Sequence, residues 1–245
     1  PQPPAPALDL VAAYLLDGNA SDDSDNDRHG VIHGVSPGAN RFGEEGMALF
    51  FDGEDDYVQL PPLELGSEYT LSVWVKPDEG KGGGYFNVLS NNGEPVWGVR
   101  EENLKQYLFG RVEGSPVARH EWTHLVLVRD GETHTLYKNG ELDATANASA
   151  GEDAFSVIGA YLPGAERLED REPFHGMIDD LIIWRGAMPS DEVFGLYELE
   201  AHHPLDLGLI RFYSLDEDQS NEFGGENQIV VNGAEPSENR FGEQG

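Results

Sequence analysis

The chain has 245 residues and a formal net charge of −31, which comes from 46 acidic and 15 basic residues. A field of this sign repels nucleic acids and anionic membrane surfaces, so the sequence excludes nucleic acid as a partner and disfavours an anionic membrane surface. Hydrophobic residues make up 38% of the chain, which is enough for a buried core and too many for a disordered protein. No apolar stretch is long enough to predict insertion into a membrane.

In chain order, residues 1–7 are rich in proline and predict a linker, and residues 8–200 predict one domain. β-Branched and aromatic residues gather in short segments of that domain, separated by turn pairs such as Asn139-Gly140. The segments are 49–60, 69–77, 85–91, 95–101, 106–112, 122–130, 133–142, 155–162 and 177–185. This pattern predicts an all-β fold, a two-sheet antiparallel β-sandwich of the jelly-roll type.

One helical segment is predicted near 189–198. Pro189 is suited to the start of a helix, because the first turn does not need its missing N–H group. Val193, Leu196 and Tyr197 then recur at helical spacing. We therefore expect a short helix with one apolar face after the last strand of the domain.

An internal repeat follows the domain. Residues 9–46 match residues 208–245 without a gap, and the run NRFGE occurs in both. The match predicts a linker at 201–207 and the first strands of a second, truncated copy at 208–245. Because an isolated strand pair is only marginally stable in water, we expect 208–245 to pack on the first domain, to exchange strands with a neighbouring chain, or to be disordered.

Three segments carry a family resemblance: FFDGEDDYVQLP at 50–61, EWTHLVLVRDGETHTLYKNGEL at 121–142, and FHGMIDDLIIWRGAMPSDEVFGLY at 174–197. They are similar to the laminin-G-like (concanavalin A-like) jelly-roll family, and they follow one another in the expected order. The resemblance implies the fold. It does not choose a function, because this fold hosts lectins, adhesins, carbohydrate-binding modules and spacers.

The resemblance also implies a structural calcium ion near the start of the domain and its last strand, with Asp52, Gly53, Asp179 and Asp180 as candidate ligands. Calcium prefers carboxylate and carbonyl oxygens. Alternation along a strand places Asp179 and Asp180 on opposite faces, so we expect at most one of these two side chains to reach a given ion. The alternative is that the acids only brace tight turns and that the acidity keeps the protein soluble.

Three short motifs match catalytic or metal-binding patterns without their structural context. His120 and His124 fit HExxH, but we expect them to enter a strand, where four residues span about 13 Å and cannot share one zinc ion. Residues 34–38 fit GxSxG in a predicted loop, without the strand and helix that this motif needs. The acidic loop 23–27 lacks the EF-hand glycine and glutamate, which leaves a looser calcium site or a solvated loop.

The candidates for ligand binding are aromatic and polar residues in loops and at sheet edges. They are Tyr85, Trp97 and Tyr161 for stacking on a sugar ring, and Arg100, Asn91 and Asn92 for polar contacts. For Tyr85 and Trp97, packing in the core is the competing explanation.

Together these features predict a non-catalytic binding or adhesion module that is stabilised by calcium and recognises a glycan or another extracellular surface ligand. The absence of cysteine favours a bacterial protein, and the proline-rich start favours a domain within a larger secreted or cell-surface protein. No Glu-x-Asp-x-x-Glu run of the related sandwich glucanases is present. Two alternatives stay open, namely a spacer repeat in a large adhesin and, less favoured, a polysaccharide-active enzyme.

Overall fold

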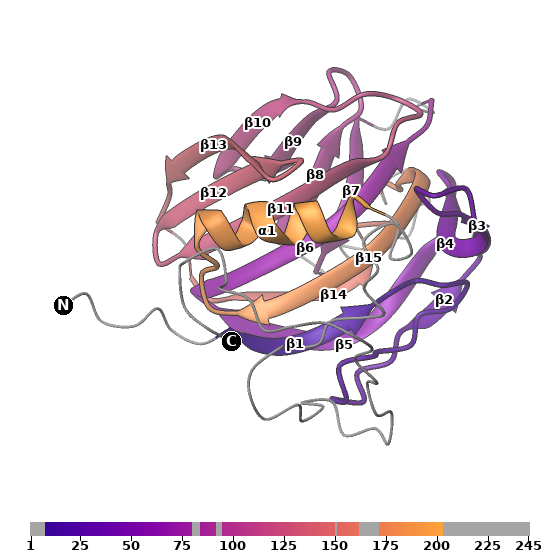
Figure 1. The fold of residues 1–245 in the computed structure, drawn as a ribbon, viewed down its shortest axis with the longest axis horizontal. Helices are drawn as coiled ribbons and strands as arrows, with labels where there is room; N and C mark the ends of the chain where they lie inside the picture. Colours follow the sequence, from indigo (N-terminus) through magenta and orange to yellow (C-terminus); the bar gives the residue numbers. More distant parts are fainter. Residues whose placement is uncertain (1–7, 80–83, 92–94, 150, 162–171, 203–245) are drawn as a thin grey trace, which may run out of the picture. The chain divides into compact units, whose positions relative to one another are not determined.

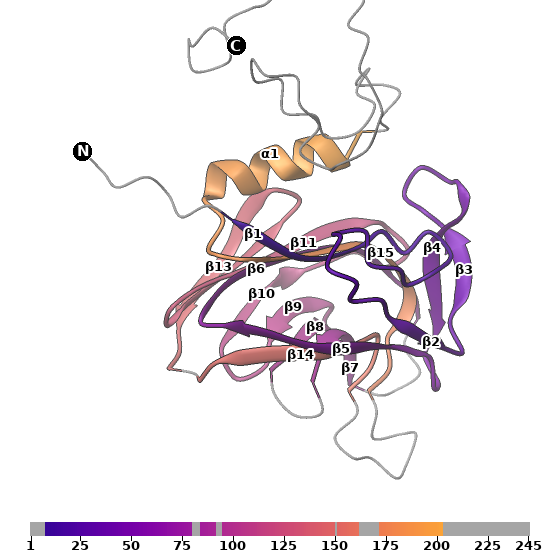
Figure 2. The same ribbon diagram turned by 90° about the horizontal axis from the view of Figure 1, so that it is seen from below.

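The computed structural model describes residues 8–79, 84–91, 95–149, 151–161 and 172–202. Within these ranges, fifteen strands form two antiparallel sheets that face one another, and one helix lies over the outer side of the first sheet (Figure 1, Figure 2). This arrangement confirms the predicted all-β sandwich with one short helix.

The first sheet has eight strands, and the last strand of the domain, β15, is central to it. In spatial order they are β13 (Glu141–Asn147), β12 (Thr133–Lys138), β11 (Thr123–Asp130), β6 (Glu68–Pro77), β15 (His175–Arg185), β4 (Glu45–Asp52) and β3 (Ser36–Ala39), while β1 (Asp9–Tyr14) also pairs with β15. Because β15 pairs with β6, β4 and β1, the two ends of the domain sequence meet in one sheet.

The second sheet has seven strands and contains the middle of the sequence. In spatial order they are β10 (Val112–Pro116), β9 (Lys105–Leu108), β8 (Val96–Arg100), β7 (Tyr85–Ser90), β14 (Asp153–Ile158), β5 (Tyr57–Gly66) and β2 (Val31–His33). Strands β7 to β10 form consecutive antiparallel pairs, so residues 85–116 occupy one half of this sheet.

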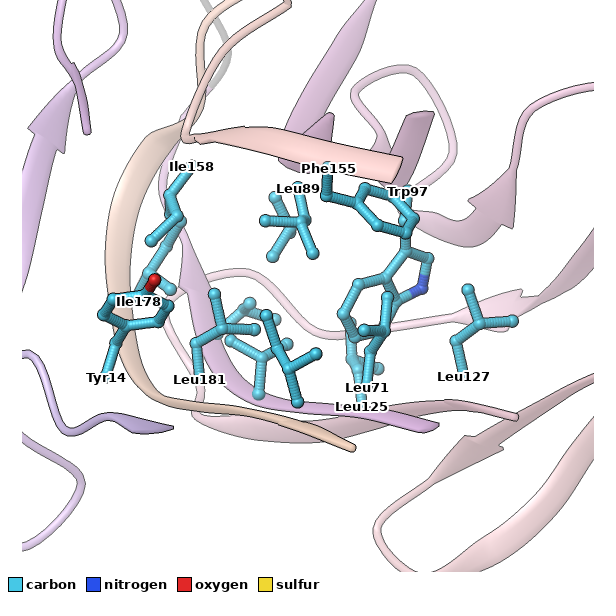
Figure 3. Close-up of a cluster of buried hydrophobic side chains, with 14 of the residues drawn as sticks. Tyr14, Leu71, Leu89, Trp97, Leu125, Leu127, Phe155, Ile158, Ile178 and Leu181 are labelled. Carbon is cyan, nitrogen blue, oxygen red and sulfur yellow. The ribbon is translucent and has the colours of Figure 1, made fainter. Parts of the chain in front are cut away.

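The hydrophobic core lies between the sheets, where alternate residues of each strand meet. Figure 3 shows part of it, with Tyr14, Leu71, Leu125, Leu127, Ile178 and Leu181 from the first sheet and Leu89, Trp97, Phe155 and Ile158 from the second. All ten side chains are at most 1% exposed. Since burial of a large apolar side chain contributes about 1.5–3 kcal/mol, this layer is the main source of stability of the domain.

The helix α1 (Ser190–Glu200) covers the outer side of β11 and β12 in the first sheet. Val193 and Leu196 pack on the outward residues Val126, Val128 and Tyr137 of β11 and β12 in a second apolar cluster. Strand β11 therefore has almost no exposed residue, which explains why its central residues Leu125–Val128 are all apolar instead of alternating. The predicted helical stripe is confirmed at both of these positions.

A buried ionic cluster joins the two sheets at one end of the sandwich. The carboxylate of Asp153 on β14 accepts hydrogen bonds from Tyr69 Oη at 2.9 Å and from Arg129 Nη1 at 2.5 Å, both on the first sheet. Arg111, just before β10, donates to both carboxylate oxygens at 2.6 and 2.7 Å. Burial alone would raise the pKa of Asp153, but the hydrogen bonds from Arg111 and Tyr69 and the two guanidinium charges lower it.

The chain divides into two compact units. The strands and most of α1 belong to the first, residues 1–199, and the second consists of residues 200–245. The predicted second copy at 208–245, the predicted linker at 201–207 beyond His202, and the proline-rich residues 1–7 lie outside the described residues. Across the described ranges, no helix has the length and apolar character needed to cross a membrane.

Candidate functional site

The outer face of the second sheet has an aromatic and charged cluster where β7, β8 and β9 run side by side. Tyr85 begins β7 and lies directly opposite Arg100, the last residue of β8. Their neighbours Phe86 and Val99 point into the core, so alternation directs Tyr85 and Arg100 outward. The predicted site residues Tyr85 and Arg100 are therefore brought together on one face.

Arg100 is the centre of this cluster. Its guanidinium carbon lies 5.1 Å from the ring centroid of Tyr85 and 5.6 Å from that of Tyr107, which are distances of cation–π contacts. Its Nη1 donates to Tyr85 Oη at 3.0 Å, and its Nε donates to Glu113 Oε2 on β10 at 2.7 Å. Lys105 Nζ donates to the other oxygen of Glu113 at 2.9 Å. One carboxylate thus bridges two cations across β8, β9 and β10.

Phe109 extends the cluster into solvent. It follows β9 in the turn at Gly110, and 41% of it is exposed. Its ring centroid lies 6.2 Å from that of Tyr85 in an edge-to-face arrangement, and the Tyr85 ring lies 5.2 Å from that of Tyr107. We name Tyr85, Arg100, Tyr107 and Phe109 the aromatic–arginine cluster. Tyr107 and Phe109 were not among the predicted residues.

Deeper on the same face, hydrogen bonds connect the cluster to Glu172, which precedes β15 in the chain. Tyr107 is 1% exposed, and its hydroxyl donates to Oδ1 of the fully buried Asn87 on β7. Asn87 Nδ2 in turn donates to the backbone oxygen of Glu172 at 2.8 Å. Burial raises the pKa of the Glu172 carboxyl, although a contact with Asn87 opposes that effect. These hydrogen bonds hold Glu172 beside the cluster, although Glu172 is far from the other cluster residues in sequence.

The remaining predicted ligand residues do not join this cluster. The prediction for Trp97 is wrong, because its side chain is 0% exposed and lies between the sheets, where it cannot stack on a ligand (Figure 3). Asn91 is half-buried and accepts a hydrogen bond from Ser156 Oγ at 3.0 Å at the other end of β7. Tyr161 is half-buried after β14. Asn92 lies outside the described residues.

The structure separates the predicted calcium ligands into two groups. Asp52 and Gly53 lie at the end of β4, where Asp52 pairs with His175, whereas Asp179 is four residues further along β15 and pairs with Trp74. Four residues of a strand correspond to about 13 Å. These two groups therefore cannot supply ligands to one ion.

The first group belongs to a tight acidic turn. Carboxylate oxygens of Asp52, Asp55 and Asp56 lie within 4.8 Å of one another. Asp56 Oδ2 accepts the backbone N–H of Asp52 at 2.9 Å, and Asp52 Oδ1 accepts that of Glu54 at 2.8 Å. Burial raises the pKa of Asp56. The hydrogen bond from Asp52 opposes this effect, and the neighbouring acids reinforce it. These oxygens suit a hard cation chemically, and they also brace the turn.

The second group is an ion pair with one arginine. Arg41 Nη1 lies 3.1 Å from Asp179 Oδ2 and 2.7 Å from Asp180 Oδ2, and the guanidinium carbon lies 4.7 Å from the ring centroid of Trp74. The prediction that Asp179 and Asp180 point to opposite faces is wrong. Asp180 has φ +44° in an irregularity of β15 between Asp179 and Ile182, so simple alternation does not hold there.

The two histidines of the HExxH match have different surroundings. His124 is fully buried in β11 and lies 2.7 Å from Ser72 Oγ through Nε2, and burial together with Arg41 lowers its pKa to about 3. His120 precedes the strand, is exposed, and lies 2.9 Å from Asp78 Oδ1. The strand predicted from the sequence is confirmed, and the residues of the match are not arranged on a helix.

Solved structures similar to the domain include a domain of an arabinanase, the binding domain of a mosquitocidal protein and a sialidase. Domain 4 of AbnA, a GH43 extracellular arabinanase from Geobacillus stearothermophilus in complex with arabinotriose, has a TM-score of 0.60 and 21% identity over 78% of this chain and 98% of that domain. The binding domain of Paraclostridial Mosquitocidal Protein 1 has a TM-score of 0.59 and 14% identity over 77% of this chain. Trypanosoma rangeli sialidase has a TM-score of 0.57 and 15% identity over 78% of this chain.

At these identities the similarity shows the fold alone. The chain spans 52% of the length of the mosquitocidal binding domain and 33% of that of the sialidase. No curated protein sequence matches the chain. The family model of the concanavalin A-like lectin/glucanases superfamily matches residues 52–194, which is more than half of the chain. The chain therefore belongs to the concanavalin A-like lectin/glucanases superfamily.

Proposed function

We propose that this protein is a non-catalytic carbohydrate-binding module whose ligand lies on the aromatic–arginine cluster of the second sheet. The observation that carries the proposal is the exposed ring of Phe109 beside Tyr85 and Arg100. Sugar rings present apolar C–H faces and a rim of hydroxyl groups. Aromatic rings suit the first and charged hydrogen-bonding groups suit the second.

The charge balance of the cluster favours a neutral sugar. Arg100 and Lys105 share the carboxylate of Glu113, and the hydrogen bonds from Lys105, reinforced by Arg100, lower the pKa of Glu113. One carboxylate thus compensates one of the two cations of this face, and the other lies in the field of a chain of net charge −31. An anionic ligand would meet a single uncompensated positive charge there, and the negative field of the whole chain would repel it.

The comparisons support this class of ligand at the level of the fold. One similar solved domain was determined with arabinotriose, and another is named as the binding domain of a toxin. A module of this kind fits a larger secreted or cell-surface bacterial protein, which is the setting that we propose. Strand exchange through 208–245 stays a proposal for the assembly of such a protein.

The binding experiment compares two exposed phenylalanines. A glycan array of neutral and acidic oligosaccharides identifies the ligand, and calorimetry measures its affinity for wild-type protein, Phe109→Ala and Phe194→Ala. Phe194 is 46% exposed on α1, over the other sheet, and is the matched control. We expect Phe109→Ala to lose about tenfold in affinity, since an aromatic contact is worth about 0.5–1.5 kcal/mol, and Phe194→Ala to bind normally. Equal binding by all three proteins would contradict the proposed site.

An enzymatic function is the second candidate, and one observation favours it. On the same face, burial raises the pKa of Glu172, which is the direction expected of the acid in glycoside hydrolysis, and Glu113 is a second carboxylate beside the cluster. Incubation of array-positive oligosaccharides with wild-type protein and Glu172→Gln separates the candidates. Product release that Glu172→Gln abolishes would support the enzyme, whereas binding without product supports the module.

We also propose that calcium stabilises the fold, with Asp52, Asp55 and Asp56 as the group that supplies its oxygens. The guanidinium of Arg41 next to Asp179 and Asp180 makes the second group unfavourable for a cation. Thermal unfolding in excess EDTA and in millimolar calcium tests the metal. We expect calcium to raise the melting temperature of wild-type protein and of Asp179→Asn but not of Asp55→Asn, and an unchanged wild-type melting temperature would contradict the metal.

A further inference from the structure

The core of the sandwich contains a glutamine among apolar residues. Gln106 on β9 is 0% exposed and lies directly opposite Val99 of β8. Val99 and Leu108, two residues further along β9, belong to the hydrophobic core, so alternation directs the amide of Gln106 between the sheets. A buried amide in such surroundings is unfavourable unless it is hydrogen-bonded.

Three buried polar atoms lie on this part of the core side. Among the residues that the structure describes, none forms a hydrogen bond with the side-chain amide of Gln106, either at Nε2 or at Oε1. The indole Nε1 of Trp97 also has no partner there. Trp97 is itself 0% exposed, and Figure 3 shows its ring between the sheets. Because the large majority of buried polar atoms in proteins have a partner, three orphaned atoms on two neighbouring strands require an explanation.

The register places these atoms near one another. Trp97 pairs with Leu108 and Val99 pairs with Gln106, so Trp97 and Gln106 are diagonal neighbours on the same face of the β8–β9 pair. Cα atoms in such positions are about 7–8 Å apart. Two hydrogen bonds through one small molecule span about 5–6 Å between heavy atoms, which is within the reach of side chains at these positions.

The chemistry of the three atoms selects the ligand. Trp97 Nε1 and Gln106 Nε2 donate only, whereas Gln106 Oε1 accepts only. The ligand must therefore accept a hydrogen bond and donate one, which a metal cation or a simple anion does not do. Water does both, and it is the smallest molecule that does so. We infer that an internal water molecule bridges the indole of Trp97 and the amide of Gln106.

The inferred water lies behind the aromatic–arginine cluster without belonging to it. Tyr107 follows Gln106 in sequence and Gly98 follows Trp97, and both of these residues are on the outward side of the same strands. The inference rests only on burial, register and hydrogen-bonding capacity. It would stand even if the proposed carbohydrate site were wrong.

Nuclear magnetic resonance on the full chain tests the water directly. The indole N–H of Trp97 is assigned by its loss in Trp97→Phe, and its cross-peaks to water are recorded by nuclear Overhauser spectroscopy in the laboratory and rotating frames. We expect cross-peaks of opposite sign in the two frames, as a long-lived internal water gives. Absence of a water cross-peak on a slowly exchanging indole N–H would overturn the inference.

A set of variants tests the bridge by its effect on stability. We expect Gln106→Met to lower the urea midpoint, because it leaves the water and the indole with fewer partners, while Leu108→Met on the same face serves as the volume-matched control. We expect Gln106→Met and Trp97→Phe together to lower the midpoint by less than the sum of the single changes. A raised midpoint for Gln106→Met, or strictly additive effects, would overturn the bridging water.

Discussion

Two clusters of the domain combine arginine and aspartate in opposite proportions. At one end of the sandwich, the single carboxylate of Asp153 is shared by Arg111 and Arg129. On the outer side of the first sheet, the single guanidinium of Arg41 is shared by Asp179 and Asp180. The first cluster has an excess of positive charge and the second an excess of negative charge, although both are largely buried.

The excess charge determines how each cluster responds to protons. Arginine stays protonated in proteins, so the cluster around Asp153 must keep its carboxylate charged, and the pKa of Asp153 is lowered. In the other cluster a proton can neutralise the excess carboxylate. Burial and then the charge of Asp180 raise the pKa of Asp179 to about 9, against the effect of Arg41. Similar residue types thus give opposite dependences of stability on pH.

The largest effect should come from breaking the cluster around Asp153. Arg129 is 1% exposed, and Arg129→Met leaves a buried carboxylate with one arginine fewer. We expect the free energy of unfolding to fall by about 3–5 kcal/mol in urea titrations, as for other broken buried ion pairs. Arg185→Met, which breaks a surface pair with Asp9, is the control and should cost about 0–1 kcal/mol. Equal losses would mean that burial of the pair does not matter.

Acid should act on the same cluster. The folded pKa of Asp153 is below its ordinary value of 3.8, so its stabilising contribution is complete above the unfolded pKa and is lost as the pH falls through the folded pKa. We expect Asp153→Asn to be less stable than wild type at pH 6 and to lose less stability between pH 5 and pH 2. Parallel curves of melting temperature against pH would assign acid sensitivity to other groups.

Asp179 should give the opposite dependence of stability on pH. Its folded pKa of about 9 is above its ordinary value of 3.8, so its contribution is complete below the unfolded pKa and is lost as the pH rises through about 9. Asparagine resembles the protonated acid. At pH 6 the wild-type protein must bind a proton at Asp179 on folding, whereas asparagine needs none, so we expect Asp179→Asn to be at least as stable as wild type at pH 6 and to reduce the loss of stability between pH 6 and pH 10. A large loss at pH 6 would show that Asp179 is charged there.

Glu113 provides the smallest and sharpest test. It has the same proportions as the cluster around Asp153, one carboxylate between two cations, but its side chain is 38% exposed. Solvent screens such a pair, so we expect Glu113→Gln to change stability by about 0–1 kcal/mol. It also leaves Arg100 and Lys105 uncompensated, and we expect gained binding of acidic oligosaccharides in the glycan array. Unchanged selectivity would show that charge balance does not govern the ligand.

Much of the fold could be read from the sequence because strands and turns are local patterns. Alternation and turn pairs predicted the sandwich, and the spacing of Val193 and Leu196 predicted the face of the helix. Two features of the candidate site, Tyr85 and Arg100, were predicted from their residue types. Phe109 was missed because it lies within the predicted strand segment 106–112. There its residue type does not distinguish it from the buried apolar residues beside it.

By itself, the sequence determined the class of fold, the acidic surface charge and the chemistry available on β7 to β10. Tertiary structure alone decided which side chains share a surface. Trp97 lies in the core because the pairing of β8 with β7 and β9 turns it inward, and neighbouring Gly98 offers no side chain to mark the opposite face. Asp179 and Asp180 meet one arginine because an irregular backbone breaks the alternation. Orientation and partner depend on long-range pairing, which local periodicity does not encode.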